Sequence, residues 1–231
     1  MKKAFTMLEL IFVMVVIGIL AFVTIPRTKT NSLEQAANQV IEHIRYTQHL
    51  AMVDDIYESN NIQWYKKRWE IKFGKSKNTN YKMAYSIFSD HINKKGNYDG
   101  KPNFSELAIN PNNLGAYLSG GYSGGLKTND KKNRSNKKMN IGEYYSIKNI
   151  LFSGGCSKNR YFLYFDYLGR PFNSINKNNS YEKDKLLTND CKISLCIEEC
   201  TGESSINELV INISKETGYV CILNMDGVCR K

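Results

Sequence analysis

The chain is poor in the side chains and motifs that enzymes use most. It has three histidines, two tryptophans and four prolines among 231 residues. His43 and His49 lie six residues apart in a helix-like stretch, which puts them on different faces, and His91 is far from both in sequence. We expect no Gly-x-Ser-x-Gly nucleophile motif, and a phosphate-binding Walker A loop, an HExxH zinc motif and a dinucleotide-binding fingerprint are all missing. We therefore expect no catalytic residue, no metal site and no cofactor, and we do not expect an enzyme.

Arginine is scarce as well, although the chain is basic. The formal net charge is +10, but 25 of the 32 basic residues are lysine and seven are arginine. Recognition of phosphates and bases favours the planar, bidentate arginine fork. The composition therefore favours a lysine-rich solvated surface, with DNA kept as a second candidate partner.

Long apolar runs are missing except at the start of the chain. Residues 5–25 form one run that carries a single charge, at Glu9. As a helix the run spans roughly 31 Å, close to the thickness of a bilayer core. We expect it to be membrane-spanning. A cleaved secretory signal fits less well, because the residues around 21–24 are bulky or branched.

The first ten residues carry a resemblance to a known family. Lys2-Lys3-Ala4, followed by Phe5-Thr6-Met7-Leu8-Glu9-Leu10, resembles the class III leader of type IV prepilins and type II secretion pseudopilins. The resemblance implies that prepilin peptidase cleaves between Ala4 and Phe5 and methylates the new amine of Phe5. It also implies that Glu9 serves methylation and docking into a filament. Ala4 is a departure, because the family usually has glycine before the cleavage point.

A carboxylate in an apolar helix calls for a cation at the same depth, and the run itself contains no basic residue. We expect the amine of Phe5 on a neighbouring subunit to neutralise Glu9 during assembly. The leader match places the N-terminus in the cytoplasm, a single span in the inner membrane and the remaining domain in the periplasm.

After the apolar run, Pro26 is expected to kink or open the helix, and family members often have proline there. Ser32 and Gln35 then fit a capping box, and small or apolar residues recur at helical spacing. We predict a helix over Ser32–Tyr57 with one face packed on the domain. Residues 36–46 resemble the opening helix of GspH/FimT-type minor pseudopilins.

Beyond Asn60 the hydrophobic period changes from helical to alternating. The predicted strands are Ile62–Phe73, Tyr81–Phe88, Tyr144–Phe152, Arg160–Tyr167, Lys192–Ile197, Glu208–Ile213 and Tyr219–Leu223. The last two read as a hairpin whose turn uses a positive φ at Gly218. Residues 165–171 and this hairpin resemble two late blocks of GspH-type domains. The expected fold class is α+β: a long N-terminal membrane-spanning helix followed by an antiparallel β-sheet or sandwich, pilin-like domain.

Residues 89–140 do not fit that pattern. The stretch is rich in glycine, asparagine and lysine and has no sustained period, so we expect loop or insertion. Residues 120–125 are glycine-rich and are expected to form a flexible loop. Residues 127–138 carry six basic residues against one aspartate, which favours a mobile solvated loop over a nucleic-acid-binding arm.

All six cysteines fall in the last third of the chain: Cys156, Cys191, Cys196, Cys200, Cys221 and Cys229. An even, clustered set beyond the apolar run favours disulfides over zinc, because the paired CxxC spacing of zinc sites is missing. Fifteen pairings are open. We predict the pair Cys221–Cys229, which closes a short C-terminal loop.

These features predict a leader at 1–4, a membrane-spanning and assembly helix at 5–25, its amphipathic continuation at 26–58 and a periplasmic β-rich domain at 59–231. The resemblance implies a minor pseudopilin of a type II secretion or DNA-uptake (competence) pseudopilus. Its implied partners are prepilin peptidase, other pseudopilins or pilins and the inner membrane. Two alternatives stay open: a minor pilin that contacts DNA through its basic surface, and a signal-anchored periplasmic enzyme.

Overall fold

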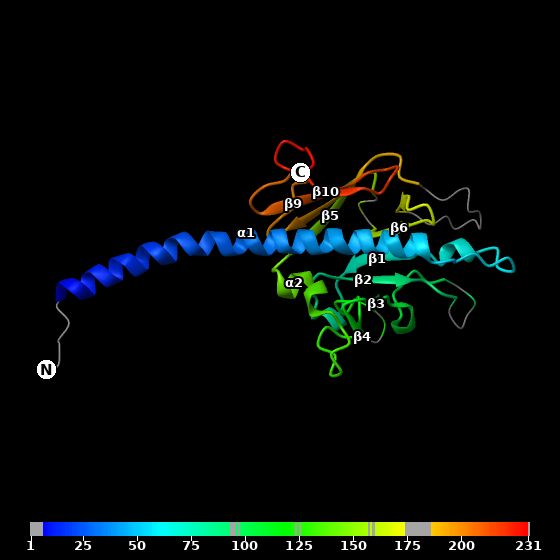
Figure 1. Ribbon diagram of the computed structural model, residues 1–231, viewed down its shortest axis with the longest axis horizontal. Helices are drawn as coiled ribbons and strands as arrows, with labels where there is room; N and C mark the ends of the chain where they lie inside the picture. The colour runs from blue at the N-terminus through cyan, green and yellow to red at the C-terminus, as the bar shows by residue number, and fades with distance from the viewer. Residues whose placement is uncertain are drawn as a thin grey trace.

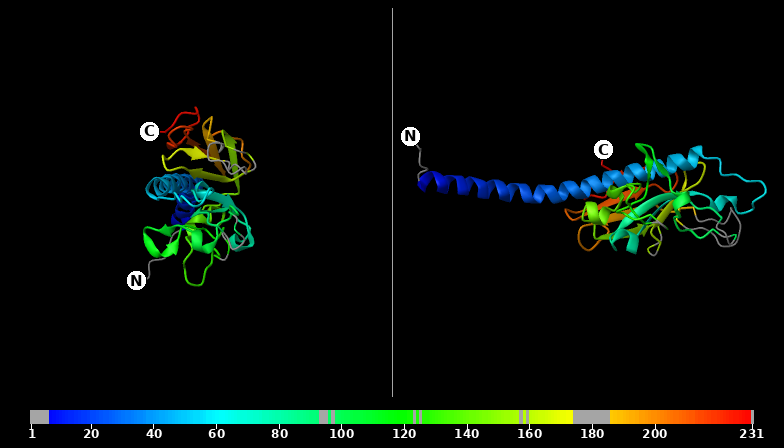
Figure 2. Two further views of the ribbon diagram at one scale, coloured as in Figure 1. Left: turned by 90° about the vertical axis from the view of Figure 1, so that its right-hand side faces the viewer. Right: turned by 90° about the horizontal axis from the view of Figure 1, so that it is seen from below.

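The computed structural model describes residues 7–92, 96, 98–122, 124, 126–156, 158, 160–173 and 186–230, with the backbone alone over 21–31. One helix runs along the whole molecule, and its second half lies against a β-rich domain (Figure 1). The first half of this helix projects from the domain, as the two further views also show (Figure 2).

Helix α1 comprises Met7–Val53, 47 residues. The backbone of Pro26 lies inside it, and the helix passes through Ser32 without a new start. The predicted capping box at Ser32 is therefore wrong. The hydroxyl of Ser32 instead donates to the carbonyl oxygen of Tyr145 at 3.0 Å, because packing against the domain gives that hydroxyl a tertiary acceptor.

The expected membrane-spanning helix is wrong. Among the residues that the structure describes, no helix combines the length and the apolar character needed to cross a membrane. The described part of α1 from Ser32 onward is amphipathic, with one face buried against the domain and the other exposed. The same finding overturns the expected fold class as stated and the expected single-pass localisation in the inner membrane.

Two antiparallel sheets form the body of the domain. The first sheet has the order β2-β1-β6-β7, with bounds Ala84–Ser89, Trp69–Gly74, Phe162–Phe165 and Pro171–Phe172. The second sheet has the order β10-β9-β8-β5, with bounds Val220–Ile222, Glu208–Ile213, Cys191–Cys196 and Asn149–Gly154. Each of the seven predicted strands overlaps an observed strand. Glu208–Ile213 has the predicted bounds, and the other six have shifted ends. The first half of the predicted strand Ile62–Phe73 is wrong, because it contains the 3₁₀ helix over Trp64–Lys66. The turn between β9 and β10 has Gly218 at a φ of 67°, also as predicted.

Helix α1 packs where the two sheets meet. It contacts β1 and β6 of the first sheet and β8, β9 and β10 of the second, and the end-on view places it between them (Figure 2). The residues that it buries recur at helical spacing: Leu33, Ala36, Ala37, Val40, Ile41, Ile44, Thr47 and Ala51. The fully buried Ala36 and Ala37 let the helix backbone approach the strands closely.

The stretch 89–140 is not simply a loop. It contains the hairpin of β3 (Ile109–Asn110) and β4 (Asn113–Tyr117) and the short 3₁₀ helices η3 (Phe104–Glu106) and η4 (Lys137–Met139). Its buried apolar side chains are Leu107, Ala108, Ala116, Leu118, Leu126 and Met139. Their spacing is irregular because each comes from a turn or a very short element, which hides the pattern from periodicity. Three further short helices complete the fold: η1 (Trp64–Lys66), η2 (Lys77–Thr79) and α2 (Ile141–Tyr144).

Candidate assembly surface and its surroundings

The largest exposed apolar surface of the described chain is the first part of α1. We call Met7–Leu20 the apolar segment. Its exposed large hydrophobic residues are Met7, Leu8, Leu10, Ile11, Phe12, Val13, Met14, Val15, Val16, Ile17, Ile19 and Leu20. Met7 and Leu8 are each 81% exposed and Phe12 is 70% exposed. Exposed apolar patches of this kind mark interaction sites.

Glu9 is exposed within the apolar segment. The other residues expected to act in processing and assembly cannot be placed as side chains. Ala4 and Phe5 lie outside the described residues, and Pro26 is placed in α1 by its backbone alone. Glu9 is therefore surrounded along the helix by exposed apolar residues. Cleavage between Ala4 and Phe5 stays a prediction.

Polar side chains of α1 fix the helix to the domain. The amide of Gln48 donates to the carbonyl oxygens of Gly169 at 2.7 Å and Thr217 at 2.8 Å. These acceptors belong to the two late blocks expected from sequence, so one side chain of the helix joins both turns. Arg45 donates to the carbonyl oxygen of Val220 at 2.9 Å. These bonds set how the apolar segment projects from the domain.

A histidine lies in the same helix-to-sheet contact. His43 Nδ1 and the hydroxyl of Tyr85 are 2.6 Å apart, and Gln39 also donates to that hydroxyl, at 2.8 Å. Burial lowers the pKa of His43 to about 4 and raises that of Tyr85. The imidazole is therefore neutral at physiological pH, and this pair serves packing.

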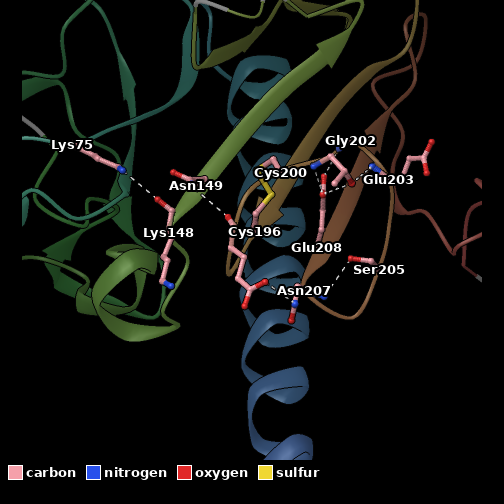
Figure 3. The surroundings of a disulfide bond; sticks show 12 residues. Lys75, Lys148, Asn149, Cys196, Cys200, Gly202, Glu203, Ser205, Asn207 and Glu208 are labelled. Atoms are coloured by element: carbon pink, nitrogen blue, oxygen red, sulfur yellow. Dashed lines mark hydrogen bonds between the residues drawn. A yellow bond between two sulfur atoms is a disulfide. The ribbon is translucent and has the colours of Figure 1, made fainter.

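All six cysteines are paired. The disulfides join Cys156–Cys191, Cys196–Cys200 and Cys221–Cys229. The predicted pair Cys221–Cys229 is confirmed, and so is the preference for disulfides over zinc. Cys196, Cys200 and the Glu208 carboxylate do lie within 4.8 Å of one another, but both sulfurs are already used in the disulfide. The cluster is drawn in Figure 3.

Glu208 organises the loop beside that disulfide. Its carboxylate accepts from the backbone nitrogens of Thr201 at 2.6 Å and Gly202 at 2.7 Å, and from the Thr201 hydroxyl at 2.8 Å (Figure 3). Burial alone would raise the pKa of Glu208, but these hydrogen bonds outweigh it and leave the pKa below its ordinary value. Glu208 is therefore a structural carboxylate.

The basic segment, residues 127–138, is anchored to the domain. The Thr128 hydroxyl donates to the Gly120 carbonyl oxygen at 2.5 Å, and Ser135 donates to the Thr128 carbonyl oxygen at 2.6 Å. Arg134 forms an ion pair with Asp130 at 2.8 Å. The exposed lysines held on this frame are Lys127, Lys131, Lys132, Lys137 and Lys138.

Sequence reasoning missed a group of buried acids. Glu70 on β1 and Asp90 after β2 are 3% and 2% exposed, and Glu106 on η3 is also buried. Burial raises the pKa of Glu70 to about 8; nearby Lys72 offsets part of the rise, and Asp90 and Glu106 add to it. Burial also raises the pKa of Asp90 to about 7, despite a hydrogen bond from the Gly100 backbone at 2.7 Å. Asp90 and Glu106 belong to the stretch 89–140, which has no hydrophobic period, so alternation gave no signal for this group.

Residues 121–125 do have the spacing Gly-x-Ser-x-Gly, so the expectation that this nucleophile motif is absent is wrong. A serine nucleophile of that type sits on a turn between a strand and a helix. Here the next described helix is η4, which begins at Lys137. Ser123 itself lies outside the described residues. The spacing therefore gives no support for an active site.

Comparison of the chain with family models, with curated proteins and with solved structures finds no match. The functional argument accordingly rests on the residues and the geometry described above.

Proposed function

We propose that the protein is a minor pseudopilin of the GspH/FimT type, which enters the filament of a type II secretion or DNA-uptake machine through its N-terminal helix. The observation that carries this proposal is the apolar segment, which projects from a disulfide-bonded β-domain and exposes apolar side chains on every face. The leader-like residues 1–6 before it support the same assignment by resemblance.

The apolar segment has the physical properties of a subunit interface. Packing it against equivalent helices of other subunits removes the twelve apolar side chains from water, which is favourable by about 25 cal/mol for each Å² buried. An all-round apolar surface requires neighbours on several sides, as in a helical filament, rather than one partner. The domain stays outside that helical core because α1 projects from it (Figure 1).

Glu9 fixes how far neighbouring helices are shifted along one another in the filament. When neighbouring helices cover the apolar segment, the Glu9 carboxylate loses water and requires a positive charge close by. Cleavage after Ala4 would create such a charge, the amine of Phe5, four residues before Glu9 in sequence. In a staggered bundle, the amine of one subunit meets the Glu9 of the next. Processing and assembly are coupled in this way.

Substitution of Glu9 tests the proposal. We expect Glu9→Val to fold and to express like the wild type, but to fall at least tenfold in the sheared filament fraction, because the register-setting ion pair is lost. The matched control is Glu42→Val, which removes an exposed carboxylate from the same helix outside the apolar segment. Incorporation of the Glu9→Val protein at the wild-type level would contradict the proposal.

Mass spectrometry of the mature N-terminus completes this test. The wild-type chain is expected to begin with N-methylated Phe5 and to lack residues 1–4. Recovery of protein that begins at Met1 from assembled filaments would count against processing by prepilin peptidase.

A second candidate function is direct contact with DNA. The observation that favours it is the anchored basic segment with its five exposed lysines. If these lysines bind phosphates, the affinity for double-stranded DNA falls steeply with salt, and Lys131→Ala/Lys132→Ala reduces the slope of log K against log salt by about two. Binding that is absent at low salt, or equal in the variant and the wild type, would exclude this function.

A further inference from the structure

A pocket lies at the C-terminal end of α1. This end of the helix is far from the apolar segment along the molecule (Figure 1). Its volume is about 490 Å³. The walls include the aromatic rings of Tyr57, Trp64 and Tyr167, and the rim carries the carboxylates of Asp54 and Asp55. Among the lining residues that the structure describes, none is basic.

The charges at this pocket all have one sign. Asp54 and Asp55 directly follow Val53, the last residue of α1, and the last turn of the helix contains no basic residue. The C-terminus of a helix carries the negative end of its macrodipole, where cations stabilise and anions destabilise. The two exposed aspartates therefore add to an existing negative potential. A fold selected for stability alone would favour lysine or arginine there.

Hydrogen bonds hold this acidic end in a defined shape. Asp54 accepts from the indole nitrogen of Trp69 at 2.8 Å, and Asp55 accepts from the backbone nitrogen of Tyr57, two residues on, at 3.2 Å. The rings of Tyr57 and Trp64 meet edge to face, with centroids 5.3 Å apart. Each of these bonds uses one carboxylate oxygen, and within the described ranges no further hydrogen bond to the second oxygen is found. Tyr57 and Tyr167 are 63% and 52% exposed, so both rings also remain accessible.

We propose that this pocket binds the side chain of a lysine or arginine presented by a partner protein. The carboxylates and the helix end neutralise the cation, and the aromatic rings contact its aliphatic stem and attract its charge through their π faces. A hydrated metal ion would gain nothing from three aromatic walls, since Ca²⁺ and Mg²⁺ prefer several oxygen ligands. This site is separate from the assembly surface and does not depend on the proposed filament.

Titration of the full-length chain with a minimal ligand tests the proposal. The probe is N-α-acetyl-lysine amide, and the reporter is the indole N–H signal of Trp64 in a ¹H–¹⁵N spectrum, assigned with Trp64→Phe. We expect a saturable shift. The matched neutral ligand, N-α,N-ε-diacetyl-lysine amide, has a similar stem without the charge and is expected to bind at least tenfold more weakly.

Variants show whether the pocket itself is responsible. Asp54→Asn/Asp55→Asn keeps the acceptor oxygens and removes the charges, and is expected to weaken binding at least tenfold. Tyr167→Leu is expected to weaken it several-fold through loss of one wall. Glu216→Gln, at an exposed site outside the lining, is the control and is expected to leave binding unchanged. Equal affinity for the two ligands, unchanged binding by the aspartate variant, or saturation by calcium chloride in place of the lysine probe would overturn the proposal.

Discussion

Glu70 shows at the scale of one residue how far the fold can move a side chain from its ordinary chemistry. The residue sits on a central strand, and one of its carboxylate oxygens is buried without a hydrogen-bond partner among the described atoms. Because burial raises its pKa to about 8, the folded protein holds a proton there that the unfolded chain releases above about pH 4.5. The folded state binds more protons in this window, so stability falls as the pH rises from about 4.5 to 8.

Glu70→Gln should remove that dependence. We expect the variant to be more stable than the wild type at pH 8 and the difference to shrink towards pH 5, with a slope change of up to about 1.4 kcal/mol per pH unit. Denaturant unfolding at several pH values measures it. Part of the pH dependence of stability should remain in the variant, because the pKa of Asp90 is also raised by burial. A difference that grows towards low pH would show that Glu70 is ionised in the folded state.

At the scale of elements, helix α1 depends on its polar contacts as well as on its buried stripe. Its apolar residues fix which face meets the sheets, but many rotations and shifts along the helix axis would bury a similar area. Gln48 selects among them because its two acceptors lie in different turns, at Gly169 and Thr217. The orientation of the apolar segment relative to the domain follows from that selection.

Gln48→Ala should therefore cost about 1–2 kcal/mol of unfolding free energy through two lost hydrogen bonds to carbonyl oxygens. Chemical denaturation measures this loss, and amide exchange at Gly218 should accelerate because the turn loses its support. The control is Gln35→Ala, the same substitution at an exposed site on the same helix. Equal effects of the two substitutions would mean that helix propensity, and not the contact with the turns, explains the loss.

At the scale of the whole molecule, the disulfides are distributed unevenly. All three lie in or beside the second sheet: Cys156–Cys191 joins the end of β5 to β8, Cys196–Cys200 joins β8 to the following loop, and Cys221–Cys229 joins β10 to the C-terminal turn. The described part of the first sheet is held by packing against α1 and the stretch 89–140. The second sheet is therefore stabilised by covalent links as well as by packing, and the described part of the first sheet by packing alone.

Removal of single disulfides should lower the stability by amounts that depend on the length of the loop each one closes. Cys156–Cys191 closes a sequence separation of 35 residues and Cys196–Cys200 one of 4. The entropy of the unfolded chain predicts a loss roughly 2 kcal/mol larger for the double serine variant of the first pair. Unfolding under oxidising conditions measures both losses. A larger loss for the short loop would show that local packing outweighs chain entropy here.

The sequence alone determined the local features of this protein. The alternating pattern and the β-branched and aromatic residues placed seven strands, although β2 and β10 are buried on both faces. Glycine at position 218 marked a turn that needs a positive φ. Short spacing marked Cys221–Cys229, because chain length keeps those two residues close. The amphipathic stripe of 33–51 predicted the buried face of the helix.

Only the tertiary structure decided the long-range features. The partner of Cys156 depends on how β5 pairs with β8, which no local pattern encodes. The grouping of Glu70 with Asp90 and Glu106 depends on how the stretch 89–140, whose apolar residues lack a period, packs beside β1. The acidic aromatic pocket exists because the end of α1 meets η1 and the turn at Tyr167, which are distant in sequence. Local patterns follow from backbone geometry, whereas these contacts follow from how the elements pack.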